Sequence, residues 1–305
     1  MTIAAALAFS PSTLVAVVAL FPLYYVVSSI LAYYRLSHIP GPALWAWSRI
    51  PLIRTHLKGD SYDKYGELCR AYGKLVRIGP NYLLTSDPEV VRRMNAPRSG
   101  YSKSNWYLAS RFTAGVDNMI SDRNDARHEI MRKKAAPAYS GKDNAQLERD
   151  VDECLLDLVH MVRDRYITTD NSHPIQMELA RKAQYFTIDA ISKLAFNEKF
   201  NDLRDDNDNF GYIEEIDTLF PNMFCMSVIP EIIEFLTATG ILAWLDPADN
   251  PKLAFGKMMR IAKAKINSRI DSEGNFKGSY GDMMGSFIKH GMTRQELEQE
   301  TILQM

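Results

Sequence analysis

Residues 128–141 read HEIMRKKAAPAYSG, and the interpretation of the whole chain starts from this stretch. His128 and Arg132 are four residues apart, so a helix places both side chains on one face. A histidine and an arginine on one face can bind carboxylates, because the guanidinium group donates paired hydrogen bonds. The same residues also fit an ordinary solvated basic helix, with Lys133 and Lys134 beside them. Spacing alone leaves both interpretations open.

The N-terminal segment is apolar and has no charged side chain between Thr2 and Tyr34. Its core, residues 14–34, reads LVAVVALFPLYYVVSSILAYY and matches the roughly 20 residues that cross a bilayer. A cleaved signal peptide would begin with a charged region and contain a shorter apolar run. Basic residues follow the segment, beginning with Arg35, so the positive-inside rule predicts a body in the cytoplasm. We therefore expect an uncleaved transmembrane anchor over residues 1–34.

The anchor is followed by a linker over residues 35–59, which contains Ile39-Pro40-Gly41-Pro42. Proline cannot continue a helix and restricts the backbone, so this sequence predicts a rigid elbow. A plain linker is equally compatible with the tetrapeptide alone.

The body, residues 60–305, is predicted to be mainly helical with a small β hairpin near its N-terminus. The hairpin is expected at 75–79 and 82–86, where LVRIG and YLLTS alternate on either side of Pro80-Asn81. Apolar periodicity and capping residues predict helices at 60–72, 88–95, 125–136, 144–166, 178–197, 210–218, 253–271, 282–290 and from Thr293 onward. We expect a long loop over 97–119 with at most one short helix, and turns at 204–209 and 274–281.

Composition excludes several classes of partner and site. The chain has 36 basic and 37 acidic residues and a net charge of −1, so no basic field favours nucleic acid. Its three cysteines, Cys69, Cys154 and Cys225, form no CxxC pair, which argues against a zinc site or a disulfide framework. No metal-binding residue is therefore assigned.

The order of these features resembles the layout of microsomal cytochrome P450 enzymes. An anchor, a Pro-Gly-Pro elbow, a β hairpin and a helix ending in A-P-x-Y-S follow one another in that family. The stretch at 128–141 resembles the family's C helix, and the resemblance implies that His128 and Arg132 contact the haem propionates. DAISKLAF at 189–196 is similar to the E helix, with Asn197 where glycine is usual. Residues 282–305 look like the H helix and the start of the I helix.

The resemblance implies an incomplete cytochrome P450 fold preceded by one transmembrane helix, and a haem-dependent monooxygenase that oxidises an apolar small molecule. It implies haem b as cofactor, an NADPH-dependent reductase as electron donor, and a single-pass location in the endoplasmic reticulum membrane. The fungal character of the sequence suggests secondary metabolism. The loop before the C helix contacts substrate in the family. This implies four substrate-side residues, although packing of the loop explains them equally well: Trp106, Phe112, Val116 and Met119.

The family's catalytic signatures are expected beyond Met305. The oxygen-handling A/G-G-x-D/E-T and the haem-ligating F-x-x-G-x-R-x-C do not occur in residues 1–305, and the E-x-x-R of the family's K helix is expected further along the chain. The resemblance gives none of the three cysteines the context of an axial ligand. We therefore assign no catalytic residue, and expect these 305 residues alone to be inactive and not to retain haem. Two alternatives stay open: a non-catalytic truncated relative that only binds a membrane or partners, and an unrelated anchored helical scaffold.

Overall fold

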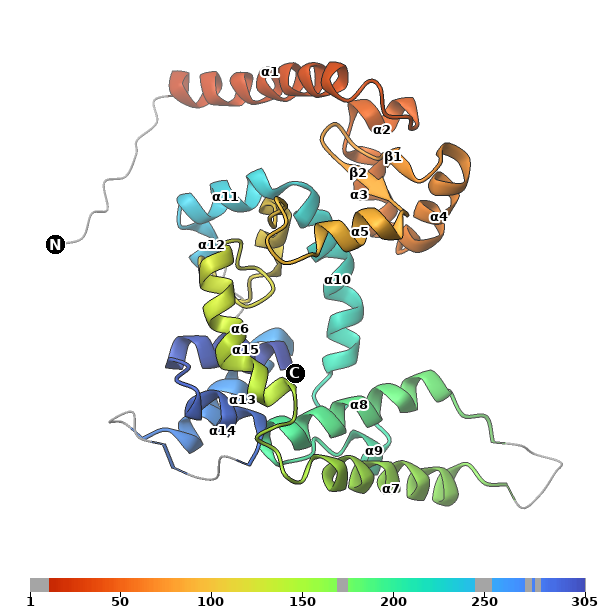
Figure 1. Cartoon of the computed structure of the whole chain (residues 1–305), viewed down its shortest axis with the longest axis vertical. Helices are drawn as coiled ribbons and strands as arrows, with labels where there is room; N and C mark the ends of the chain where they lie inside the picture. The colour runs from red at the N-terminus through yellow and green to blue at the C-terminus, as the bar shows by residue number, and fades with distance from the viewer. Residues whose placement is uncertain (1–10, 169–174, 245–253, 272–275, 278–280, 305) are drawn as a thin grey trace. The chain divides into compact units, whose positions relative to one another are not determined.

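The computed structural model describes residues 11–168, 175–244, 254–271, 276–277 and 281–304 (Figure 1). The chain divides into two compact units, Met1–Tyr101 and Ser102–Met305. The described residues are mainly helical and contain one two-stranded antiparallel sheet, which confirms the predicted fold class at this level.

The first unit contains the sheet. Its elements are α1 (Pro11–Arg35), α2 (Ala43–Trp47), α3 (Ile50–Lys58), α4 (Ser61–Tyr72), β1 (Leu75–Arg77), β2 (Leu83–Thr85) and α5 (Pro88–Met94). Strands β1 and β2 pair with Val76 opposite Leu84, so the predicted hairpin is confirmed. The carboxylate of Asp87 accepts a hydrogen bond from the backbone N–H of Glu89 at 2.9 Å and caps α5.

The predicted anchor over residues 1–34 corresponds, in its described part, to α1, which continues through Pro22. Among the described residues, no single helix is both long and apolar enough to cross a membrane. Two helices of the second unit are long and apolar enough only when they are taken together, and the chain bends by 89° between them. They are α10 (Tyr212–Val228) and α11 (Pro230–Ala238). The anchor over residues 1–34 stays a prediction.

The second unit is built from helices around an apolar core. Its elements are η1 (Asn105–Ser110), α6 (Asp125–Tyr139), α7 (Leu147–Arg165), α8 (Leu179–Phe196), α9 (Asp202–Asp205), α10, α11, α12 (Ile241–Trp244), α13 (Ala254–Arg269), α14 (Met283–Lys289) and α15 (Arg294–Gln304). The main core joins Ala135 of α6, Phe196 of α8, Ile266 of α13, Phe287 of α14 and Leu297 of α15. Helices α7 and α8 lie side by side (Figure 1) and enclose a second apolar cluster, which includes Met161 and Ile188.

Helix α6 does not end before Pro137, as the sequence predicted, but continues to Tyr139. Proline removes one backbone hydrogen bond, to the carbonyl of the residue four positions earlier. That residue is Lys133, whose side chain is 73% exposed, so water can replace the lost donor. The N–H of Ser140 then bonds the carbonyl of Ala136 at 2.9 Å and completes the last turn.

Residues 204–209 were predicted as a solvated turn, and this is wrong in part, because α9 covers the first two of them. The carboxylate of Asp189 in α8 accepts hydrogen bonds from the N–H groups of Asp202 and Leu203, at 3.1 and 3.0 Å. The buried Asp189 thus supports the start of a short helix through a contact that no local pattern reveals. Asn197, which replaces the usual glycine, adopts φ 57° and ψ 30° and ends α8 in the left-handed conformation that asparagine tolerates.

Two further predictions concern the end of α10 and a turn near residue 280. Helix α10 runs to Val228, beyond the predicted end at residue 218, and contains Pro221. The turn predicted at 274–281 lies mainly outside the described residues.

Candidate functional site

The candidate cofactor site is built on helix α6. The side chain of Asn124 accepts a hydrogen bond from the N–H of Arg127 at 3.0 Å and caps the helix. Met131 and Ala135 pack into the core, which fixes how α6 is rotated. His128 is half-buried and Arg132 is exposed, one turn apart on a face that flanks this packed face. The predicted pairing of the two residues on one face of a helix is thus observed.

The other cations on α6 bind carboxylates of the protein. Arg127 pairs with Asp122 at 2.5 Å, Lys133 with Glu129 at 3.4 Å, and Lys134 with Glu296 of α15 at 2.8 Å. Within the part of the chain that the structure describes, neither His128 nor Arg132 has a hydrogen bond or an ion pair from its side chain. These two side chains are therefore the ones available to an external anion.

Electrostatics favour the neutral form of His128. Burial lowers the pKa of its imidazole, and the positive charges of Lys103 and Arg132 add to this effect, whereas Asp122 opposes it. A neutral imidazole still donates one N–H, and an approaching carboxylate would favour its protonation. The site thus offers a hydrogen-bond donor next to a permanent positive charge.

Lys103 is a residue of this site that the sequence reasoning missed. Its ammonium donates hydrogen bonds to the carbonyls of Met119 and Ile120, at 3.0 and 2.9 Å. Its charge also contributes to the lowered pKa of His128. A single lysine in a loop without periodicity carries no sequence signal that links it to a histidine 25 positions away, so only the fold reveals that the two residues are close enough to interact.

The four predicted substrate-side residues do not gather in one place. Phe112 and Met119 are partly buried against the main core. Trp106 instead packs against Phe224 of α10, with the ring centroids 5.8 Å apart. Val116 forms an isolated bridge with Thr113 and closes a tight turn. Of the four, Phe112 and Met119 thus pack against the main core, and contact with substrate stays a prediction for all four.

Cys154 and the half-buried Cys225 have the character of packing residues. Cys154 is fully buried, and desolvation raises the pKa of its thiol to about 11. Burial also raises the pKa of the Cys225 thiol. Both thus favour the protonated thiol, whereas a metal ligand must be a thiolate. Among the described residues, no group of three or more His, Cys, Asp and Glu side chains could bind a metal ion.

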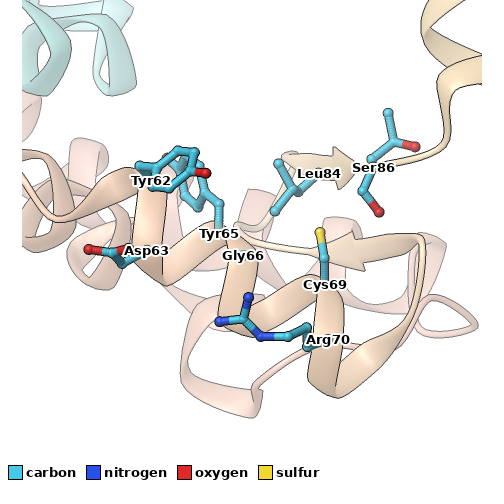
Figure 2. A pocket seen from close by; sticks show the side chains of 9 residues that line it. Tyr62, Asp63, Tyr65, Gly66, Cys69, Arg70, Leu84 and Ser86 are labelled. Carbon is cyan, nitrogen blue, oxygen red and sulfur yellow. The ribbon is translucent and has the colours of Figure 1, made fainter.

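Cys69 lines a cavity of about 310 Å³ in the first unit, between α4 and β2. Figure 2 shows Tyr65 and Cys69 of α4 on one side of it and Leu84 of β2 on the other. The residues that line this cavity include none of the six predicted cofactor-side and substrate-side residues.

His128 and Arg132 fit the propionate groups of a haem. Each lacks a protein partner among the described residues, and both lie on one face of a helix whose rotation the core fixes. A guanidinium group binds one carboxylate through two hydrogen bonds, and the adjacent imidazole can donate to a second.

Comparison with known proteins identifies the family of the chain. The family model of cytochrome P450 matches residues 39–302. Cytochrome P450 monooxygenase aba1 of Botryotinia fuckeliana is 34% identical over 87% of this chain and 52% of its own length. Cytochrome P450 monooxygenase ABA1 of Pyricularia oryzae is 33% identical over 95% of this chain and 57% of its own length. The chain belongs to the cytochrome P450 family, and it spans a little over half the length of these two curated relatives.

A third relative is similar to a smaller part of the chain. It is the inactive cytochrome P450 monooxygenase lolP2 of Epichloe uncinata, which is 35% identical over 50% of this chain and 82% of its own length. The family resemblance inferred from residues 128–141 and 189–196 is thereby confirmed.

Proposed function

We propose that this chain supplies the N-terminal part of a membrane-bound cytochrome P450 monooxygenase that inserts one oxygen atom from O₂ into an apolar small molecule. The observation that carries the proposal is the pair of side chains on α6, His128 and Arg132, which have no protein partner among the described residues. The similarity to fungal proteins named as cytochrome P450 monooxygenases supports it and is compatible with a role in secondary metabolism.

The residues of this chain would bind and orient the cofactor. Arg132 would contact one propionate of haem b through its guanidinium group, and His128 would donate an N–H to the other. The ion pair of Lys134 with Glu296, at 2.8 Å, joins α6, the helix that bears both side chains, to α15. Haem, once bound, would supply the activation of O₂. Phe112 and Met119 would present apolar surface to the substrate.

The proposed location is the endoplasmic reticulum membrane, with residues 1–34 as a single-pass anchor and an NADPH-dependent reductase as partner. The uncharged sequence between Thr2 and Tyr34 supports this. Extraction of membranes with alkaline carbonate tests the anchor. The full chain should stay in the membrane pellet, and a variant that begins at residue 35 should be released. Release of the full chain would contradict the anchor.

A non-catalytic relative is the second candidate function. Residues 1–305 contain no F-x-x-G-x-R-x-C sequence, and a relative that matches half of this chain is named inactive. Such a protein would bind a membrane or partners without oxygen chemistry.

The carbon monoxide difference spectrum of the reduced protein separates the two candidates. The transcript is sequenced across Met305, and its product is expressed beside the 305-residue chain, each with added haemin. A thiolate-type Soret band from the longer product alone supports the monooxygenase. A transcript without a haem-binding cysteine, and a product without the band, supports the non-catalytic relative. A thiolate-type band from residues 1–305 would contradict the absence of an axial ligand in them.

A further inference from the structure

Helix α15 contains a carboxylate in the interior of the second unit. Glu300 is completely buried, and so is its neighbour Thr301. The Oε1 atom of Glu300 accepts a hydrogen bond from the backbone N–H of Met119 at 3.1 Å, across 181 positions of sequence. Its Oε2 atom has no hydrogen-bond partner among the described residues. Among the described residues, Oε1 is therefore the only oxygen of this carboxylate that has a hydrogen-bond partner.

The segment that Glu300 contacts is the loop before α6, residues 111–122, named here the 111–122 loop. Gln299, the residue before Glu300, donates a hydrogen bond from Nε2 to the hydroxyl of Thr113 at 3.1 Å. Two consecutive residues of α15 thus bind two separate points of the loop. Between these points lie Val116 and the tight turn that it closes with Thr113.

The peptide units on either side of Met119 are fixed from two directions. Glu300 accepts the N–H of Met119, while Lys103 donates to its carbonyl at 3.0 Å. The next turn is internally bonded, because the side-chain oxygen of Asn118 accepts from the N–H groups of Ile120 and Ser121, both at 2.9 Å. The position of the Met119 side chain against the core therefore depends on a small number of polar contacts, and Glu300 provides the one from α15.

A carboxylate at this depth is costly. Transfer of its charge from water into the protein interior costs free energy, and an apolar side chain would fill the same space without that cost. A hydrogen bond to a charged group nevertheless contributes more than a neutral one and defines the position of its donor. A buried carboxylate whose observed hydrogen bond goes to a loop backbone is thus suited to fixing that loop, rather than to adding stability.

We propose that Glu300 is a positioning residue, which sets the conformation of the 111–122 loop through the Met119 N–H and thereby the shape of the apolar wall that Phe112 and Met119 present to substrate. The statement about the loop stands on the structure of this chain, and the statement about substrate rests on the proposed function. For the position of the loop, the length of the side chain at residue 300 matters more than its charge. An aspartate keeps the charge but withdraws the oxygen by one methylene group, whereas a glutamine keeps both the length and an acceptor oxygen.

Hydrogen exchange of backbone amides, followed by mass spectrometry on the 305-residue chain, tests the proposal. Glu300→Asp should speed the exchange of the peptide that contains Met119 by about tenfold or more, because loss of about 1.4 kcal/mol is a factor of ten. Glu300→Gln should leave the exchange of that peptide within about threefold of the wild type. Glu298→Asp is the matched control, since its carboxylate bonds Arg294 at 3.3 Å instead of the loop. It should change nothing in the loop.

The proposal is overturned if Glu300→Asp leaves exchange in the 111–122 loop unchanged, or if Glu300→Gln speeds it as much as Glu300→Asp does. It is also overturned if Glu300→Asp speeds exchange equally throughout the second unit, because the residue would then act on the whole fold. The experiment needs neither haem nor substrate. Its failure would leave the roles of His128 and Arg132 intact, and failure of haem binding would leave this result intact.

Discussion

The guanidinium group of Arg77 donates a hydrogen bond to the backbone carbonyl of Tyr33 at 3.1 Å and so joins strand β1 to the last turn of helix α1. The side chain is buried, lies 5.4 Å from the centre of the Tyr33 ring, and also donates to the carbonyls of Gly79 and Pro80. A positive charge at the C-terminus of a helix is favourable. The direction in which α1 leaves the hairpin is thus set by a buried contact.

Replacing Arg77 should loosen this junction. Arg77→Ala leaves three carbonyls without their donor and opens a cavity. We therefore expect the free energy of unfolding of the first unit to fall by roughly 2–5 kcal/mol. Limited proteolysis should cut the linker at residues 36–42 faster in this variant. Arg70→Ala is the control, because Arg70 is exposed. Equal cutting of the wild type and Arg77→Ala would show that Arg77 does not fix the junction.

Gly41 should not accept a side chain. A Cβ atom built there lies 2.3 Å from the carbonyl oxygen of Arg77, and the N–H of Arg77 bonds the carbonyl of Pro40 at 2.8 Å. Gly41→Ala therefore forces the elbow and β1 apart, at a cost of about 1–3 kcal/mol or more. Gly100→Ala is the matched control, since a Cβ there meets nothing within 4 Å. Urea unfolding of both variants checks this, and equal stability would contradict the close approach.

In a longer product that also carries the haem-binding cysteine and has been loaded with haem, Arg132 should slow the loss of haem. A hydrogen bond to a charged group contributes roughly 1.5–3 kcal/mol, so Arg132→Ala should raise the rate of haemin transfer to apomyoglobin by about tenfold or more. Lys133→Ala removes the same charge from a side chain that is 73% exposed and paired with Glu129. It should leave the rate nearly unchanged. If both variants lose haemin equally fast, Arg132 has no specific contact with a propionate.

Glu300 should make the stability of the second unit depend on pH. Burial raises the pKa of its carboxyl from 4.5 to about 7. Below pH 4.5 the group is neutral in both states and carries no penalty. As the pH rises toward 7 and above, the unfolded chain ionises first, and the folded state loses on the order of 3 kcal/mol.

Glu300→Gln removes this titration. The stability of the variant relative to the wild type should therefore increase between pH 5 and pH 8, as measured by urea unfolding at both values. Asp202, whose pKa burial raises to about 6, is present in both proteins and cancels in the comparison. A difference that does not change with pH would show that Glu300 titrates at an ordinary value.

Most of the local structure follows from neighbouring residues. The helix at 88–95, the hairpin around Pro80-Asn81 and the start of α15 were all predicted from the local sequence. The last is a capping box, in which the N–H of Thr293 bonds the Glu296 carboxylate at 2.7 Å and the N–H of Glu296 bonds the Thr293 hydroxyl at 3.3 Å. The capping contacts join residues two or three positions apart, and the hairpin pairs residues no more than ten positions apart, so a short stretch of sequence contains the groups that decide them.

The candidate site was predictable only in part. The shared face of His128 and Arg132 follows from helical spacing and is seen in α6. Their lack of partners is a property of the fold, because Lys134 could be assigned to Glu296 only once α6 and α15 were in contact. The separation of Trp106 from Phe112 and Met119 also depends on which helices the loop reaches.

The sequence by itself determined the class of protein, the hairpin, most of the longer helices in their order, and the pair of side chains that share one face of α6. Only the tertiary structure decided that α6 passes through Pro137, that Asp189 supports α9, and that the buried Glu300 bonds Met119. The physical reason is the separation along the sequence between the groups that interact. Periodicity and capping report interactions within one or two turns, whereas the burial of a carboxylate and its partner 181 positions away exist only after the helices pack.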